Sequence, residues 1–144
     1  MTATRTTLLA LASRVEAATG ADRELGARVI AAALAPANAF VEQSKINGAW
    51  CIYTADADGK NRSWQPPRGV RGDDRCPTAS LDAAMSLVPS GYEWSVNWCG
   101  NSVANVSEIG VDYPVHCGGA ATPALALTAA CLRARAIAWS MTDD

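Results

Sequence analysis

The chain has only one histidine, His116, and this scarcity removes most of the usual side chains for general acid–base catalysis. Sequence patterns that accompany common catalytic and nucleotide sites are also missing. There is no Gly-x-Gly-x-x-Gly, no phosphate-binding loop ending in Gly-Lys-Ser or Gly-Lys-Thr, no Gly-x-Ser-x-Gly and no His-Glu-x-x-His. We therefore expect a protein that is not an enzyme.

Long apolar runs are missing too, since no stretch reaches the roughly 18 residues that a membrane-spanning helix needs. The first residues carry a cation and then an apolar segment, as a secretory signal does. Arg14 and Glu16 interrupt that segment, however, and no small-x-small cleavage site precedes a sensible mature start. We interpret the segment as an amphipathic helix and expect a cytoplasmic protein without a membrane partner.

The five cysteines are an odd number and include no Cys-x-x-Cys pair. This pattern favours reduced thiols, several of them buried, over a disulfide framework. His116 and Cys117, with Cys99 and Cys131, form the only cluster with metal-ligand chemistry. Their spacing lacks the close ligand pairs of tetrahedral zinc sites, and no third group is evident that would orient the histidine for a Cys–His nucleophile. We expect neither a metal nor another cofactor.

The strongest local charge lies in residues 60–75, where five basic and two acidic side chains give a net charge of +3 in a chain of net charge −2. Basic residues beside a tryptophan are suited to binding phosphates and stacking a base, or to anchoring on an acidic protein surface. The candidate binding residues are Arg62, Trp64, Arg68, Arg71 and Arg75. The alternative interpretation is a solvated, Gly- and Pro-rich loop in which Trp64 packs back onto the sheet.

Apolar periodicity and end signals predict four helices and five strands. The helices are expected at 4–17, 22–34, 80–88 and 122–139, and the strands at 50–53, 63–65, 92–98, 103–108 and 111–117. Residues 56–59 read as a hairpin turn. Residues 37–47 are polar and irregular, with one helical turn at 40–43.

Residues 92–98 have the clearest strand pattern in the chain. Apolar Tyr92, Trp94, Val96 and Trp98 alternate with polar residues, which predicts a strand with one apolar face. Trp94 and Trp98 therefore share a face, and we expect that face to pack against a helix. The alternative is that this face is an exposed interface.

A helix followed by a strand occurs twice, at 22–34 with 49–53 and at 80–89 with 92–98, before the closing helix. Weak internal similarity of this kind favours a sheet packed against helices, with one helix and its neighbouring strands from each copy. The expected fold class is α+β: a mainly antiparallel sheet of four or five strands with helices packed on its faces. The length suits a single domain over residues 1–144.

Three segments, 16–25, 78–89 with the following Trp94, and 121–135, together resemble a family of small uncharacterised phage and prophage proteins. The Trp-Gln-Pro-Pro stretch at 64–67 is similar to an aromatic-then-Pro-Pro element of the same family. The resemblance covers about two-thirds of the chain and is absent at 36–48 and 101–120. It implies an α/β/α sandwich and a phage origin, and it implies no activity and no catalytic residue.

The function expected from these observations is that of a small, non-enzymatic phage- or prophage-encoded accessory protein in the host bacterial cytoplasm. It would bind a host or phage macromolecule, most naturally a protein, and a counter-defence (anti-CRISPR-like) inhibitor is one such role. The alternative is a nucleic-acid- or nucleotide-binding module that uses residues 60–75. If neither use of this segment holds, the Trp94/Trp98 face is the next candidate surface.

Overall fold

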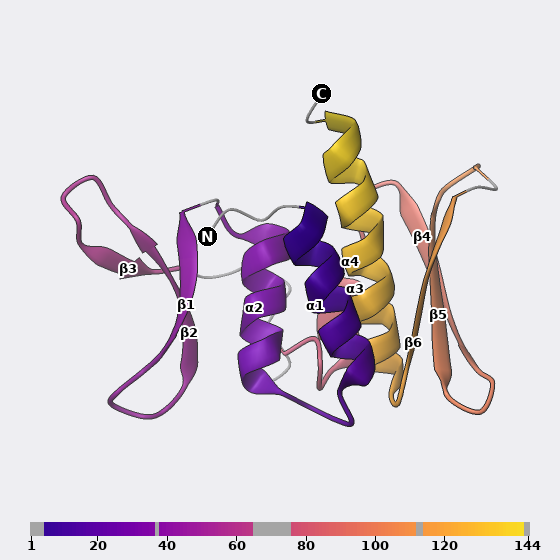
Figure 1. Ribbon diagram of the computed structural model, residues 1–144, viewed down its shortest axis with the longest axis horizontal. Coiled ribbons are helices and arrows are strands. Elements are labelled where there is room, and N and C mark those ends of the chain that lie inside the picture. Colours follow the sequence, from indigo (N-terminus) through magenta and orange to yellow (C-terminus); the bar gives the residue numbers. More distant parts are fainter. Residues whose placement is uncertain (1–4, 37, 65–75, 112–113, 143–144) are drawn as a thin grey trace.

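The computed structural model describes residues 5–36, 38–64, 76–111 and 114–142, and of residues 138–142 only the backbone (Figure 1). Within these ranges the chain forms four α-helices and six β-strands. In chain order they are α1 (Arg5–Ala17), α2 (Arg23–Leu34), β1 (Ala39–Gln43), β2 (Trp50–Ala55), β3 (Asn61–Ser63), α3 (Leu81–Met85), β4 (Tyr92–Trp98), β5 (Ser102–Glu108), β6 (Val115–Ala120) and α4 (Pro123–Thr142).

The strands form two antiparallel sheets, and the helices lie between them (Figure 1). Sheet A has the strand order β1-β2-β3 and packs on α2, whereas sheet B has the order β4-β5-β6 and packs mainly on α4. The expected α+β class and antiparallel pairing are confirmed. The structure does not form the expected single sheet of four or five strands with helices on both faces. Each three-stranded sheet instead has one face against helices, so the strands are the outer layers.

The succession of a helix and a three-stranded antiparallel meander occurs twice, as α2-β1-β2-β3 and as α3-β4-β5-β6. The repeat expected from the sequence is present in this coarse form. The prediction matched residues 49–53, which form β2, with β4. In the structure the strand equivalent to β4 is β1, which was missed because residues 37–47 were expected to be irregular. Only Ala39 of β1 is fully buried, which leaves the apolar alternation of this strand weak.

Helix α4 is the centre of the main hydrophobic core. Every side chain in residues 124–132 is buried, because α4 contacts α1, α3 and all three strands of sheet B. A helix enclosed in this way needs small or apolar residues all round, which explains its alanine and leucine content. The helix predicted at 122–139 is confirmed, and two of its apolar residues at seven-residue spacing, Leu125 and Leu132, have no exposed surface. The side chain of Trp139 lies outside the described residues.

The backbone of β6 lies directly against α4 at Gly118. A Cβ atom placed on Gly118 would lie 2.2 Å from the carbonyl oxygen of Ala126 and 2.8 Å from the amide nitrogen of Ala130. Both atoms belong to the helix backbone, so no side-chain rotation could relieve the clash. The last strand was expected at 111–117, which would leave the glycines at 118 and 119 outside it. They instead lie within β6, where the first of them makes this close contact possible.

Helix α2 belongs to two cores at once. Leu25 and Val29 are part of the main core, whereas Ile30 and Ala31 face sheet A. The sheet A core consists of Ile30, Ala31, Ala39 and Ile52, with Leu34, Ala35, Val41 and Trp64 half-buried against it. This second core is much smaller than the first, and sheet A is therefore held to the rest of the fold mainly through one face of α2.

An ion pair between α1 and α4 occupies the outer edge of β6. Arg133 donates from Nη1 to Glu16 Oε2 (2.7 Å) and to the carbonyl oxygen of Cys117 (2.7 Å), and from Nη2 to Glu16 Oε1. The backbone N–H of Gly119 donates to Glu16 Oε2 (2.9 Å). Since β6 is an edge strand, these side chains occupy two of the backbone groups that a further strand would use, the Cys117 carbonyl and the Gly119 N–H.

Replacing Gly118 by alanine should destabilise the fold by at least about 2 kcal/mol, because the added methyl group would overlap the backbone of α4. Chemical denaturation of the purified protein measures this change. The matched control is Gly20→Ala, where an added Cβ meets nothing within 4 Å and the change should stay under about 1 kcal/mol. Equal effects of the two substitutions would contradict the close contact.

The Glu16 ion pair should make the free energy of unfolding depend on pH in the acidic range. The hydrogen bond from Arg133, helped by the Gly119 amide, lowers the pKa of Glu16 below its ordinary value of 4.5 although burial opposes the shift. A carboxyl with a lowered folded pKa stabilises the fold above its unfolded pKa, and this contribution is lost as the pH falls through the folded value. The difference in unfolding free energy between the native protein and Glu16→Gln should therefore shrink as the pH falls below 4.5. A difference that stays constant from neutral pH to pH ~3 would contradict this assignment.

Candidate binding surface at the hairpin of sheet A

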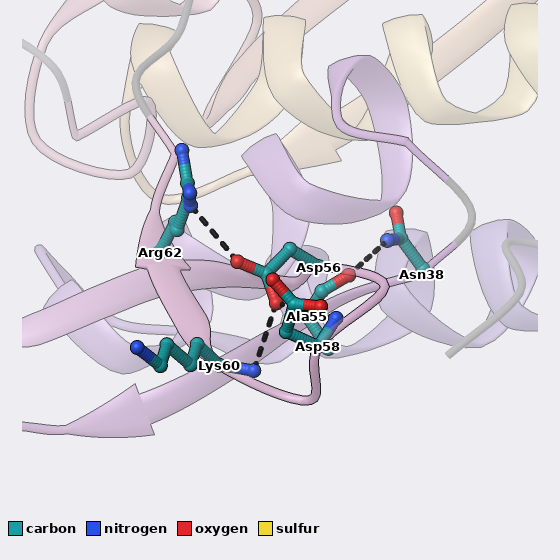
Figure 2. A network of polar contacts seen from close by, with 6 residues as sticks. All are labelled: Asn38, Ala55, Asp56, Asp58, Lys60 and Arg62. Atoms are coloured by element: carbon teal, nitrogen blue, oxygen red, sulfur yellow. Dashed lines mark hydrogen bonds and ion pairs between the residues drawn. The ribbon is translucent and has the colours of Figure 1, made fainter.

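The turn between β2 and β3 is built around the carboxylate of Asp56 (Figure 2). Asp56 Oδ1 accepts the backbone N–H groups of Asp58 (3.0 Å) and Lys60 (2.9 Å). Gly59 has a positive φ of 77° and donates its N–H to the Asp56 carbonyl at 3.0 Å. The predicted hairpin turn at 56–59 is thus confirmed. The side chain of Asp56, its first residue, stabilises the turn by accepting backbone N–H groups within it.

A second set of contacts extends this order to the strand ends. Asp56 Oδ2 accepts Nε of Arg62 at 3.1 Å, and Asn38 Nδ2 donates to the carbonyl oxygen of Ala55 at 3.1 Å (Figure 2). The first contact spans the hairpin and the second joins the residue before β1 to the end of β2. The hairpin is therefore fixed on both sides by side chains.

Of the five candidate binding residues, the structure describes Arg62 and Trp64, and Arg62 is the charged one. Its side chain is 76% exposed, and its contact with Asp56 uses only Nε. The two terminal nitrogens have no partner among the residues that the structure describes. An exposed pair of this kind adds little stability. Its effect is to orient the guanidinium group with most of its donors directed to solvent.

Trp64 lies within the candidate segment, and its side chain packs inward. Its ring is half-buried against the sheet A core, and its backbone N–H donates to the carbonyl oxygen of Ile52 at 2.7 Å. This position agrees with the alternative interpretation of Trp64, in which the ring returns to the sheet. The remaining candidates, Arg68, Arg71 and Arg75, lie outside the described residues.

The chain after the candidate segment is also anchored on α2. A Cβ added at Gly26 would lie 2.6 Å from Cys76 Sγ, so this turn sits closely on the helix. The Thr78 hydroxyl accepts the N–H of Asp22 and donates to the Asp22 carbonyl, both at 2.9 Å. Thr128 of α4 donates its hydroxyl to the carbonyl oxygen of Pro77 at 3.0 Å. Trp64 and Cys76, which flank residues 65–75, are therefore both anchored, the first on the sheet A core and the second on α2.

The outer face of sheet A carries an aromatic pair that the sequence analysis missed. Phe40 and Tyr53 are cross-strand partners, with ring centroids 5.8 Å apart and an angle of 31° between the rings. Both are half-buried, and the next pair along the face is Glu42 with Cys51. The available signal was the alternation in residues 39–42, where Ala39 and Val41 face the helix while Phe40 and Glu42 face outward.

The other surface predicted from the sequence is only partly exposed. Trp94 and Trp98 do share the helix-facing side of β4, as expected. Trp94 packs against the main core, whereas Trp98 at the strand end is 73% exposed. Tyr92 and Val96 also pack against the core.

The histidine and cysteines do not converge. His116 is buried on the helix-facing side of β6, and burial lowers its pKa from the ordinary value. Cys117 faces the opposite side, where its thiol donates to Asn105 Oδ1 at 3.1 Å. Burial raises the pKa of Cys131 to about 12. All five cysteines are free thiols, with Cys76 and Cys131 buried. In the described ranges, no group of three or more His, Cys, Asp or Glu residues is placed to hold a metal ion.

Comparisons of the chain with protein-family models, with curated proteins and with solved structures found no match. None of the helices in the described ranges is both long and apolar enough to cross a membrane.

Replacing Asp56 by alanine should open the hairpin tip, because two backbone N–H groups lose a charged acceptor worth about 1.5–3 kcal/mol per hydrogen bond. Hydrogen exchange of the Lys60 amide, followed by NMR, should become about tenfold faster or more. Asp58→Ala is the control, since the described structure gives the Asp58 carboxylate no contact. Similar exchange in both variants would show that Asp56 does not hold the turn.

Proposed function

We propose that the protein is a non-enzymatic binding protein whose contact surface is the β2–β3 hairpin together with residues 60–75. The observation that carries the proposal is the placement of Arg62, a largely exposed guanidinium oriented by Asp56 on a hairpin that is itself fixed. Arg62 lies in the net-basic segment 60–75, and the two residues that flank positions 65–75 are both anchored, Trp64 on the sheet A core and Cys76 on α2. Anchored ends reduce the ordering cost that a contact surface has to overcome on binding.

A protein is the partner that the chemistry favours. Arginine is a frequent anchor of protein interfaces, and the Arg62 side chain is largely exposed. The Phe40–Tyr53 pair is not part of the same surface, because Arg62 is the cross-strand partner of Thr54 and therefore lies on the opposite face of sheet A from Tyr53. A nucleic-acid surface would need an exposed ring for base stacking, and Trp64 is half-buried against the sheet A core. The net charge of −2 over the chain also opposes attraction to phosphates.

The biological setting follows from the resemblance to phage and prophage proteins. We propose an accessory protein that acts in the bacterial cytoplasm and binds a host or phage protein. A counter-defence inhibitor fits this setting, because inhibition by binding needs a contact surface and no catalytic group. A nucleic-acid partner remains the alternative that the following experiment separates.

Capture of partners from host lysate, with and without nuclease, identifies the class of partner. The combined variant Arg68→Ala, Arg71→Ala and Arg75→Ala should then bind the captured protein at least about tenfold more weakly, a loss of about 1.4 kcal/mol in binding free energy. The matched control replaces Arg5 and Arg14 by alanine, because both are exposed on α1 and their removal also lowers the positive charge. Calorimetry should show that this control variant binds the captured protein with unchanged affinity.

Two results would contradict the proposal. Unchanged affinity both in the combined variant and in Arg62→Ala would exclude residues 60–75, and the exposed Trp98 end of β4 would become the next surface to test. Loss of capture after nuclease treatment, with an affinity that falls steeply as salt rises, would identify a nucleic-acid partner instead.

A further inference from the structure

Sheet B has two edges, and only one of them is covered. At the β6 edge, Arg133 and Glu16 occupy the carbonyl of Cys117 and the N–H of Gly119. At the β4 edge, the described residues provide no such cover, and β4 pairs only with β5. An uncovered edge strand is a template for pairing with another strand.

The register of β4 on β5 shows which backbone groups are free. Ile109 donates its N–H to the Gly91 carbonyl (2.9 Å), and Cys99 donates to the Asn101 carbonyl (2.8 Å). Hydrogen-bonded pairs alternate along an antiparallel ladder, so the odd-numbered residues of β4 bond to β5. The N–H and C=O groups of Trp94, Val96 and Trp98 therefore point away from β5. They have no hydrogen-bond partner in the described part of the chain.

Strand β4 also lacks the features that discourage edge pairing. It contains no proline and no lysine, and its register with β5 is continuous over all seven residues, without a bulge. Its one charged residue, Glu93, points to the exposed outer face. At one end, Trp98 leaves 73% of its surface exposed. The strand is thus long, regular and apolar on one face.

The sequence of β4 is self-complementary about Ser95. Read in either direction, the strand gives an aromatic residue, a polar residue, an apolar residue and then the central serine. Antiparallel pairing with a second copy about a two-fold axis at Ser95 would place Tyr92 opposite Trp98 and Trp94 opposite Val96. It would also place Glu93 opposite Asn97, whose amide is able to donate to the carboxylate. No like charges would face one another, and aromatic or apolar cross-strand pairs stabilise a sheet.

The hydrogen-bonding geometry agrees with this register. Pairing Trp94 with Val96 and Tyr92 with Trp98 makes the even-numbered residues the hydrogen-bonded pairs, and these are the residues whose backbone groups point outward. The N–H of Tyr92 already donates to the Pro89 carbonyl at 3.1 Å, so the new ladder begins at its C=O. Ser95 would face Ser95 of the second copy in a non-hydrogen-bonded pair.

We propose that two copies of the protein dimerise by antiparallel pairing of their β4 strands, which joins the two B sheets into one continuous sheet. The exposed Trp98 ring is then covered by Tyr92 of the second copy. The contact is confined to one strand and its flanking side chains, at the lower end of specific interfaces, so the dissociation constant should be on the order of 10 μM. This surface is separate from the hairpin of sheet A, so the dimer does not depend on the proposed function.

Analytical ultracentrifugation of the full chain over a wide concentration range tests the dimer. The native protein should shift from monomer to dimer, and Trp98→Lys should weaken the dimer at least about tenfold, because it places a charge at the paired edge. The control is Ile46→Lys, since Ile46 is 97% exposed in the β1–β2 turn and should leave dimerisation unchanged. A native protein that stays monomeric up to about 1 mM would overturn the proposal, because a dimer with this dissociation constant would be largely formed there.

Cysteine crosslinking tests the register itself. Facing residues in a non-hydrogen-bonded antiparallel pair have Cα atoms about 4.5 Å apart, which a disulfide is able to span. With the exposed Cys99 and Cys117 replaced by serine, Ser95→Cys should form a disulfide-linked dimer under mild oxidation. Ser107→Cys, on the same outer face but on the central strand β5, is the control and should remain monomeric. Equal crosslinking in the two variants would exclude the proposed two-fold axis.

Discussion

The close contact between the backbone of β6 and helix α4 is the constraint on which the larger half of the fold depends. With no side chain at Gly118, the sheet approaches the helix so closely that Ala126 and Ala130 meet strand backbone directly. The other faces of α4 are then available to α1 and α3, and the helix is enclosed. Its small residues follow from this enclosure. The same closeness brings Arg133 within reach of the β6 edge, where it meets Glu16 from α1.

Sheet A is attached in a different way. It has a small core of its own, and α2 supplies both that core and part of the main one. Arg135 of α4 strengthens this arrangement, since its guanidinium donates to the carbonyl oxygens of Leu87 (2.8 Å) and Ala33 (3.2 Å) near the C-terminal ends of α3 and α2. A cation in that position satisfies carbonyl groups that a helix end leaves without partners. The hairpin surface is therefore carried by a small unit on a well-packed support.

Elements with strong periodicity could be predicted from the sequence, and elements defined by tertiary contacts could not. The four helices and the strand at 92–98 were recognised because their apolar residues repeat at helical or alternating spacing. Strand β1 was missed because it buries little more than Ala39, and β6 was misplaced because Gly118 has meaning only against α4. The order of the layers depends on which face each sheet buries, which no local pattern encodes. For the candidate surface, the hairpin turn was predicted, whereas the Phe40–Tyr53 contact depended on the missed strand.

The unequal edges of sheet B set a limit on how far an assembly can grow. A sheet with two open edges adds copies without end and forms a fibre, since every addition leaves a new edge. Here the ion pair of Glu16 and Arg133 blocks the second edge, so a copy that joins through β4 presents only a blocked edge to the next one. The salt bridge is thus a terminator of polymerisation as well as a contact between helices.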